Sequence, residues 1–161
     1  MCAGAGVSTR PTRTLTADCT LSHPADGQPL LTINNEHAKA EISLFGAHVL
    51  RYQRHSEPAS LWLSDKAVLD GSKPIRGGIP LCWPWFGPSP ARVGSGKPAH
   101  GFARTSLWTL DGVSDHGDGT LVHLSLRDTD ASRALWPHAF ELELDVLVGK
   151  ELSLVLTTRN T

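Results

Sequence analysis

The sequence has 161 residues, of which 40% are hydrophobic and 19% charged, and its formal net charge is −1. This length suits one domain with a substantial core and is too short for two full-size domains. The nearly neutral charge provides no basic field for nucleic acid or anionic lipid, and no apolar run approaches the roughly 20 residues of a membrane span. We therefore expect the partner to be a small molecule or another protein.

The cysteines indicate the compartment. Cys2, Cys19 and Cys82 are odd in number, lie far apart and form no CxxC pair. Such spacing indicates neither a disulfide framework nor structural zinc, so we expect no metal and a reducing, cytoplasmic location. The first residues are rich in small and hydroxyl-bearing side chains and lack the apolar segment of a secretory signal. We expect residues 1–24 to form a flexible extension and residues 25–161 to form one domain.

Alternation of apolar and polar residues with a period of two recurs along the chain, whereas helical periodicity is scarce. It predicts short strands at residues 30–34, 40–44, 49–53, 61–63, 106–110 and 121–126. The Asp-His-Gly-Asp-Gly sequence at 115–119 carries the turn signals that join the last two of these strands. The single helical segment that we expect covers 129–136 and stops at Pro137.

The clearest predicted element is a C-terminal hairpin. Two alternating runs, residues 140–146 and 152–156, flank Gly149-Lys150, which is a Gly-X turn. Short, closely spaced strands with turn signals between them predict an all-β fold, namely an antiparallel β-sandwich. Because an alternating strand comes last, we also expect an unpaired sheet edge.

The candidate site lies in two segments that glycine and proline interrupt, residues 75–87 (IRGGIPLCWPWFG) and 98–104 (PAHGFAR). Such segments present side chains on loops instead of in a ladder. Arg76 and Arg104 are the candidate substrate-binding residues, because a guanidinium group binds phosphate through charge-assisted hydrogen bonds of about 1.5–3 kcal/mol each. His100, in a turn near Arg104, is the candidate catalytic residue.

Each candidate has a plainer interpretation. Most arginines are surface residues, and a lone histidine is more often structural or exposed. Trp83, Trp85 and Phe86 suit stacking on a sugar face, but such residues more often build the core, and we expect at least one of the two tryptophans to be buried. The remaining histidines lack comparable neighbours, and we interpret them as structural or exposed: His23, His37, His48, His55, His116, His123 and His138.

The motifs resemble those of a known family. Their order is that of the hexose-6-phosphate mutarotases (glucose-6-phosphate 1-epimerases), within the galactose mutarotase-like and aldose 1-epimerase superfamily. The resemblance covers the chain from about residue 30 onward and rests on residues 46–48 (GAH), 61–64 (LWLS), 76–87 (RGGIPLCWPWFG), 100–104 (HGFAR) and 136–138 (WPH).

The resemblance implies a large antiparallel β-sandwich of the supersandwich type, with the sugar in a groove on one sheet. It implies that Arg76 and Arg104 bind a hexose 6-phosphate and that His100, the first of two active-site histidines, holds the sugar oxygens. The implied reaction interconverts α and β anomers without a cofactor. An acid protonates the ring oxygen, a base deprotonates the anomeric hydroxyl, and the opened ring recloses on the other face.

The sequence also departs from the family pattern. The family's second histidine and its catalytic carboxylate would follow Thr161, so the chain resembles only the N-terminal half of a mutarotase and the sandwich is expected to be incomplete. Ala99 replaces the usual polar residue before the His-Gly pair. Three hypotheses follow: an N-terminal fragment of a mutarotase, a non-catalytic phosphosugar-binding module, or an interaction domain that recruits a second chain, including one that supplies the missing half, by strand addition.

Overall fold

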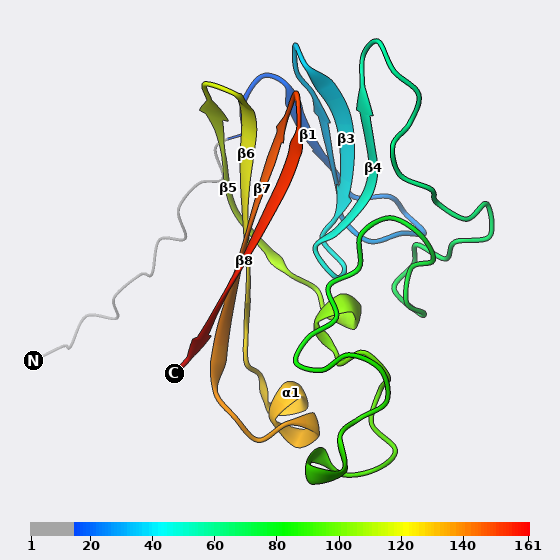
Figure 1. The fold of residues 1–161 in the computed structure, drawn as a ribbon, viewed down its shortest axis with the longest axis vertical. Coiled ribbons are helices and arrows are strands. Elements are labelled where there is room, and N and C mark those ends of the chain that lie inside the picture. Colours follow the sequence, from blue (N-terminus) through cyan, green and yellow to red (C-terminus); the bar gives the residue numbers. More distant parts are fainter. Residues whose placement is uncertain (1–14) are drawn as a thin grey trace, which may run out of the picture.

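Two four-stranded antiparallel sheets make up the fold (Figure 1). The structure, a computed structural model, describes residues 15–161. The strands of the first sheet follow one another in chain order: β1 (Cys19–Ser22), β2 (Leu30–Asn34), β3 (Ala38–Ser43) and β4 (His48–Arg54). The second sheet repeats this simple order with β5 (Thr109–His116), β6 (Gly119–Arg127), β7 (Phe140–Gly149) and β8 (Leu152–Asn160).

The core lies between the two sheets. Along β7 every second side chain is buried, and Leu142, Leu144 and Val146 are fully inaccessible to solvent. Leu31 and Ile33 of β2 belong to the same buried cluster. A strand with one face on the core and the other in water gives this alternation, and the antiparallel β-sandwich predicted from it is confirmed.

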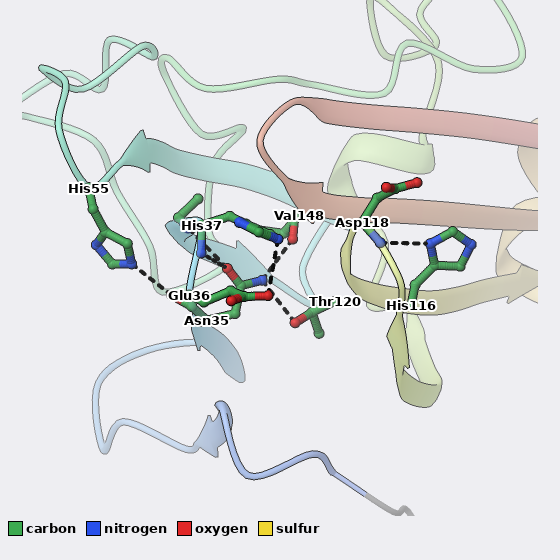
Figure 2. Close-up of polar contacts among 9 residues, drawn as sticks. Asn35, Glu36, His37, His55, His116, Asp118, Thr120 and Val148 are labelled. Atoms are coloured by element: carbon green, nitrogen blue, oxygen red, sulfur yellow. Dashed lines mark hydrogen bonds and ion pairs between the residues drawn. The ribbon is translucent and has the colours of Figure 1, made fainter.

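A buried amide links the two sheets at one end of the sandwich (Figure 2). The Asn35 Nδ2 donates to the Thr120 hydroxyl at 2.9 Å and to the Val148 carbonyl at 2.7 Å. Its Oδ1 accepts from the backbone N–H groups of His37 and Ala38, each at 3.0 Å. All of the side chain's hydrogen-bonding capacity is therefore used inside the protein.

Two strand predictions need correction. Residues 61–63 form no strand, because only Leu63 makes a single bridge, to Gly77. The strand expected at 106–110 begins at Thr109, and the residues before it close a 3-10 turn, η2 (Ala103–Thr105). That strand then extends to His116, so the connecting turn is shorter than the glycine-rich cluster indicated.

The helical prediction is confirmed. Helix α1 spans Asp130–Leu135, and the Thr129 side chain caps it by accepting a hydrogen bond from the Ser132 N–H. A second short 3-10 turn, η1, covers Ala91–Val93. None of the helices in residues 15–161 is long and apolar enough to cross a membrane.

The expected N-terminal extension, residues 1–24, falls largely outside the described residues. Its described part contains β1, which pairs with β2 through Cys19 opposite Ile33 and Leu21 opposite Leu31. Strand β1, the outer strand of the first sheet, therefore lies within residues 1–24, which we expected to form a flexible extension. Four residues are too few for their alternation to stand out in the sequence.

Candidate functional site

The segments that carry the candidate residues belong to the long connection between β4 and β5, drawn in green beside and below the sheets (Figure 1). Hydrogen bonds fix its first part to β4. The Ser60 N–H donates to the Tyr52 carbonyl at 3.0 Å, and the Ile79 N–H donates to the Val49 carbonyl at 2.9 Å. Within the connection, the Gly78 N–H donates to the Trp62 carbonyl at 2.8 Å. Arg76 is exposed at the edge of this attachment.

Reciprocal contacts with Gly87 hold His100. The His100 N–H donates to the Gly87 carbonyl at 2.7 Å, and the Gly87 N–H donates to His100 Nδ1 at 3.0 Å. An Nδ1 that accepts a hydrogen bond places the proton of the neutral ring on Nε2. Phe86 packs edge to face on the ring, with 4.7 Å between ring centroids. The half-buried imidazole is therefore oriented with a donor at Nε2.

Gly101 explains why this turn needs glycine after the histidine. Its φ is +69°, and a Cβ there would lie 2.0 Å from the Trp83 carbonyl oxygen. That carbonyl accepts from the N–H groups of Phe102 and Ala103 at 3.0 and 3.2 Å. The two candidate segments thus lie against each other through backbone contacts that leave no room for a side chain.

Arg104 is half-buried. Its Nη2 donates to the Ala99 carbonyl at 2.9 Å, and its Nε is buried without a partner. Arg76 and Arg104 have no carboxylate partner among residues 15–161, and the same holds for Arg92. All other described arginines form ion pairs with Asp or Glu: Arg51, Arg54, Arg127, Arg133 and Arg159. The described arginines that lack a carboxylate partner therefore all lie in the connection that carries the site.

The aromatic residues divide between core and surface. Trp85 is buried and its Nε1 donates to the Pro98 carbonyl at 3.0 Å, so the expectation of at least one core tryptophan is confirmed. Trp83 is half-buried and packs on Phe140, with 4.6 Å between ring centroids. Phe86, by contrast, is 80% exposed beside His100. Of the three, Phe86 offers the freest ring face to a ligand.

A pocket borders the Trp83 side of the site. Its volume is about 420 Å³, and it lies between Trp83 and Pro84 on one side and Trp136, His138 and the last residues of β8 on the other. Trp83 forms a bridge with Gly101, so the pocket is adjacent to the His100 turn. No group of three or more His, Cys, Asp or Glu side chains within residues 15–161 is arranged to hold a metal ion.

The position of His48 beneath the site is not evident from the sequence. This residue is only 1% exposed, and its Nε2 lies 2.7 Å from the Gly77 carbonyl oxygen, directly after Arg76. Burial lowers the pKa of His48, the hydrogen bond to Gly77 opposes this effect, and the charge of Arg104 lowers it further. His48 is therefore a structural histidine, as expected, but one beneath the site. The Gly46-Ala-His48 motif was the available signal.

Residues 29–161 match the sequence model of the family described as aldose 1-epimerase. The chain belongs to the aldose 1-epimerase family. A relative from Escherichia coli K12, named "Putative glucose-6-phosphate 1-epimerase", is 38% identical over 125 residues, which are 78% of this chain and 42% of that protein. The match thus spans less than half the length of the relative.

Solved structures place the chain in the same fold. The crystal structure of a "putative mutarotase" from Salmonella typhimurium superposes with a TM-score of 0.84 at 33% identity, covering 92% of this chain and 49% of that one. A galactose mutarotase-like protein from Lactobacillus casei superposes with a TM-score of 0.62 at 24% identity, covering 81% and 44%. The galactose mutarotase-like fold expected for this member of the aldose 1-epimerase family is confirmed, and the chain corresponds to about half of it.

Proposed function

We propose that this chain supplies the substrate-binding part of a hexose-6-phosphate mutarotase, a glucose-6-phosphate 1-epimerase. The observation that carries the proposal is the pair of unneutralised arginines on the segments that adjoin the oriented His100. A guanidinium group without a carboxylate partner keeps its charge and donors available for an anion such as phosphate. Membership of the aldose 1-epimerase family supports a sugar as the molecule that carries the anion.

Each residue has a distinct role in this proposal. Arg76 and Arg104 bind the phosphate of the substrate. His100 Nε2 donates to a sugar oxygen, because Nδ1 is already occupied by the Gly87 N–H. The exposed Phe86 ring covers an apolar face of the sugar. Ring opening needs an acid at the ring oxygen and a base at the anomeric hydroxyl, and His100 contributes by holding and polarising one of these oxygens.

Titration of the protein with glucose 6-phosphate by calorimetry tests the binding role. Arg76→Ala and Arg104→Ala should each weaken binding about tenfold or more, because each removes charge-assisted hydrogen bonds of about 1.5–3 kcal/mol. Arg92→Ala is the matched control, since Arg92 also lacks a carboxylate partner but lies in η1, and it should leave affinity unchanged. Equal losses in all three variants, or affinity for glucose equal to that for glucose 6-phosphate, would contradict the proposal.

A second candidate function is phosphosugar binding without turnover. Among residues 15–161, no carboxylate forms a hydrogen bond with His100, Arg76 or Arg104, so no acid–base pair is assembled around the histidine. Measuring anomer exchange of glucose 6-phosphate by NMR separates the two functions when the protein is purified from its own cells together with any second polypeptide that completes the fold. Exchange that the protein accelerates and Arg76→Ala abolishes supports the mutarotase. Binding without acceleration supports the module.

The proposal extends to a second polypeptide that completes the fold, in the cytoplasm. Within the described residues β8 pairs only with β7, and Val155 on it is 55% exposed. Cys19 and Cys82 are free thiols, as a reducing compartment favours. The native mass of the protein purified from its own cells tests whether such a partner is bound. We expect a second polypeptide to be present in stoichiometric amount.

A further inference from the structure

His48 occupies the point where the chain carrying Arg76 crosses the start of β4. Its Nε2 lies 2.7 Å from the Gly77 carbonyl oxygen, and its ring is almost completely buried. A carbonyl oxygen only accepts hydrogen bonds, so Nε2 carries the proton and Nδ1 of the neutral ring is an acceptor. Nδ1 is buried and has no partner. The imidazole thus uses its single proton to hold the residue next to Arg76.

The next residue along the chain, Gly78, shows how closely this segment lies on β4. A Cβ at Gly78 would lie 2.9 Å from His48 Nε2 and 2.3 Å from the Val49 carbonyl oxygen. The φ of Gly78 is +63°, a conformation that glycine adopts at little cost. The ring of His48 and the backbone of β4 therefore fix the height of the Arg76-Gly-Gly turn above the sheet.

The residues just before His48 contact the other arginine. The Gly46 N–H donates to the Ser106 carbonyl at 2.7 Å, and a Cβ on Gly46 would lie 2.6 Å from the Arg104 carbonyl oxygen. The charge of Arg104 also acts on the His48 ring and lowers its pKa, in the same direction as burial. Residues 46–48 therefore lie between the backbone that carries Arg76 and the backbone that carries Arg104.

We propose that His48 is a positioning residue that sets the spacing of Arg76 and Arg104, and through it the affinity of the site for the phosphate of a hexose 6-phosphate. This inference rests on the proposed function, which assigns the two arginines to the substrate. The rigid His48 ring anchors the Arg76 segment through its one donor, which reaches the Gly77 carbonyl. Gly46, two residues earlier in the chain, packs on the backbone of the Arg104 segment. Removing the donor leaves the Gly77 carbonyl without its side-chain partner and weakens the anchoring of the Arg76 turn on β4.

Three substitutions separate the donor from the bulk of the ring. His48→Gln keeps an N–H donor near the position of Nε2, whereas His48→Asn carries its amide too close to the backbone to reach Gly77. His48→Leu keeps apolar volume without any donor. His55→Leu is the matched control, since His55 Nε2 also lies 2.7 Å from a backbone carbonyl oxygen, that of Asn35, at the end of the sandwich drawn in Figure 2.

Two measurements are made on every variant. Hydrogen exchange of the Gly78 and Ile79 amides reports the anchoring of the turn without any ligand, and calorimetric titration with glucose 6-phosphate reports affinity. His48→Leu and His48→Asn should exchange faster at both amides and bind about tenfold more weakly, a loss of about 1.4 kcal/mol. His48→Gln should remain within about threefold of the wild type, a difference below the tenfold step of 1.4 kcal/mol. His55→Leu should change neither quantity.

The outcomes distinguish this inference from the proposed function. Wild-type protein that binds no glucose 6-phosphate overturns both. Wild-type binding that Arg76→Ala abolishes but His48→Leu leaves intact overturns only the role of His48. Equal weakening by His48→Gln and His48→Asn also overturns it, because the donor would then not matter. If His48→Leu does not fold, the comparison of the Gln and Asn variants decides the question.

Discussion

The protonation of one buried residue, His48, makes the stability of the protein depend on pH. Burial, together with the charge of Arg104, lowers its pKa in the folded state, while the unfolded chain has the ordinary value of about 6.5. Below about pH 6.5 the unfolded state therefore binds more protons than the folded state. The contribution of the neutral ring to stability is complete above this pH and is lost as the pH falls.

This gives a prediction for unfolding in urea at a series of pH values. The free energy of unfolding of the wild type should fall below about pH 6.5 with a contribution of up to about 1.4 kcal/mol per pH unit from His48. His48→Leu should lose that contribution, so the two curves should converge toward acid pH. Parallel curves over this range would show that His48 is not the titrating group.

The residues of the site differ in how far the sequence reveals them. Arg76, His100 and Arg104 stand out because glycine and proline surround them, and such segments form loops. His48 stands in a strand-like run, and its partner Gly77 is 29 residues away along the chain. Sequence spacing carries no information about which buried ring lies beneath which turn. Only the packing of the loop on β4 shows that His48 contacts the Arg76 segment.

Among the elements, the contact between the β2–β3 turn and the second sheet is the one most sensitive to a single substitution. Asn35→Ala removes both hydrogen bonds to Thr120 and Val148 and both bonds from the His37 and Ala38 amides. These groups are left in the interior, where an unsatisfied polar group costs about 1–3 kcal/mol. We expect Asn35→Ala to lower the free energy of unfolding by roughly 2–4 kcal/mol, as buried polar networks do when broken.

Thr120→Val is the graded control, because it removes one of these four partners and keeps the volume of the side chain. It should cost about 1 kcal/mol, the net value of a single hydrogen bond. Urea unfolding at neutral pH measures both variants. A loss for Asn35→Ala no larger than that for Thr120→Val would show that the amide does not join the sheets.

The elements also show which patterns predict structure. The β7–β8 hairpin was predicted correctly because its alternation is long and continuous. Residues 61–63 are a run of only three apolar residues between loops, and Leu63 finds a bridge partner only in Gly77. The expected strand at 106–110 failed for a related reason, since Ser106 donates its N–H to Ala103 and closes a turn first. Pairing partners, which the sequence does not specify, decide whether a short apolar run becomes a strand.

At the scale of the whole molecule, the inner face of the second sheet is only partly covered by the other described residues, 15–161. On β7 the inward side chains of Leu142 and Leu144 are fully buried. Leu156, which lies opposite Leu144 on β8, is 37% exposed. The first sheet therefore covers β7 but reaches only part of β8, and the match spans less than half the length of the Escherichia coli relative. Within the described residues β8 is also an edge strand, so it offers unpaired backbone groups beside apolar side chains.

We therefore expect the chain, purified alone, to associate with itself through β8, because an apolar edge strand pairs with another whenever nothing blocks it. Sedimentation velocity should show species larger than the 17.3 kDa monomer that grow with concentration. Leu156→Lys places a charge on the half-covered face and should restore the monomer. Leu107→Lys is the control, since Leu107 is 56% exposed but lies outside the named strands. A wild type that stays monomeric at every concentration, or equal effects of the two lysines, would show that β8 is not the associating edge.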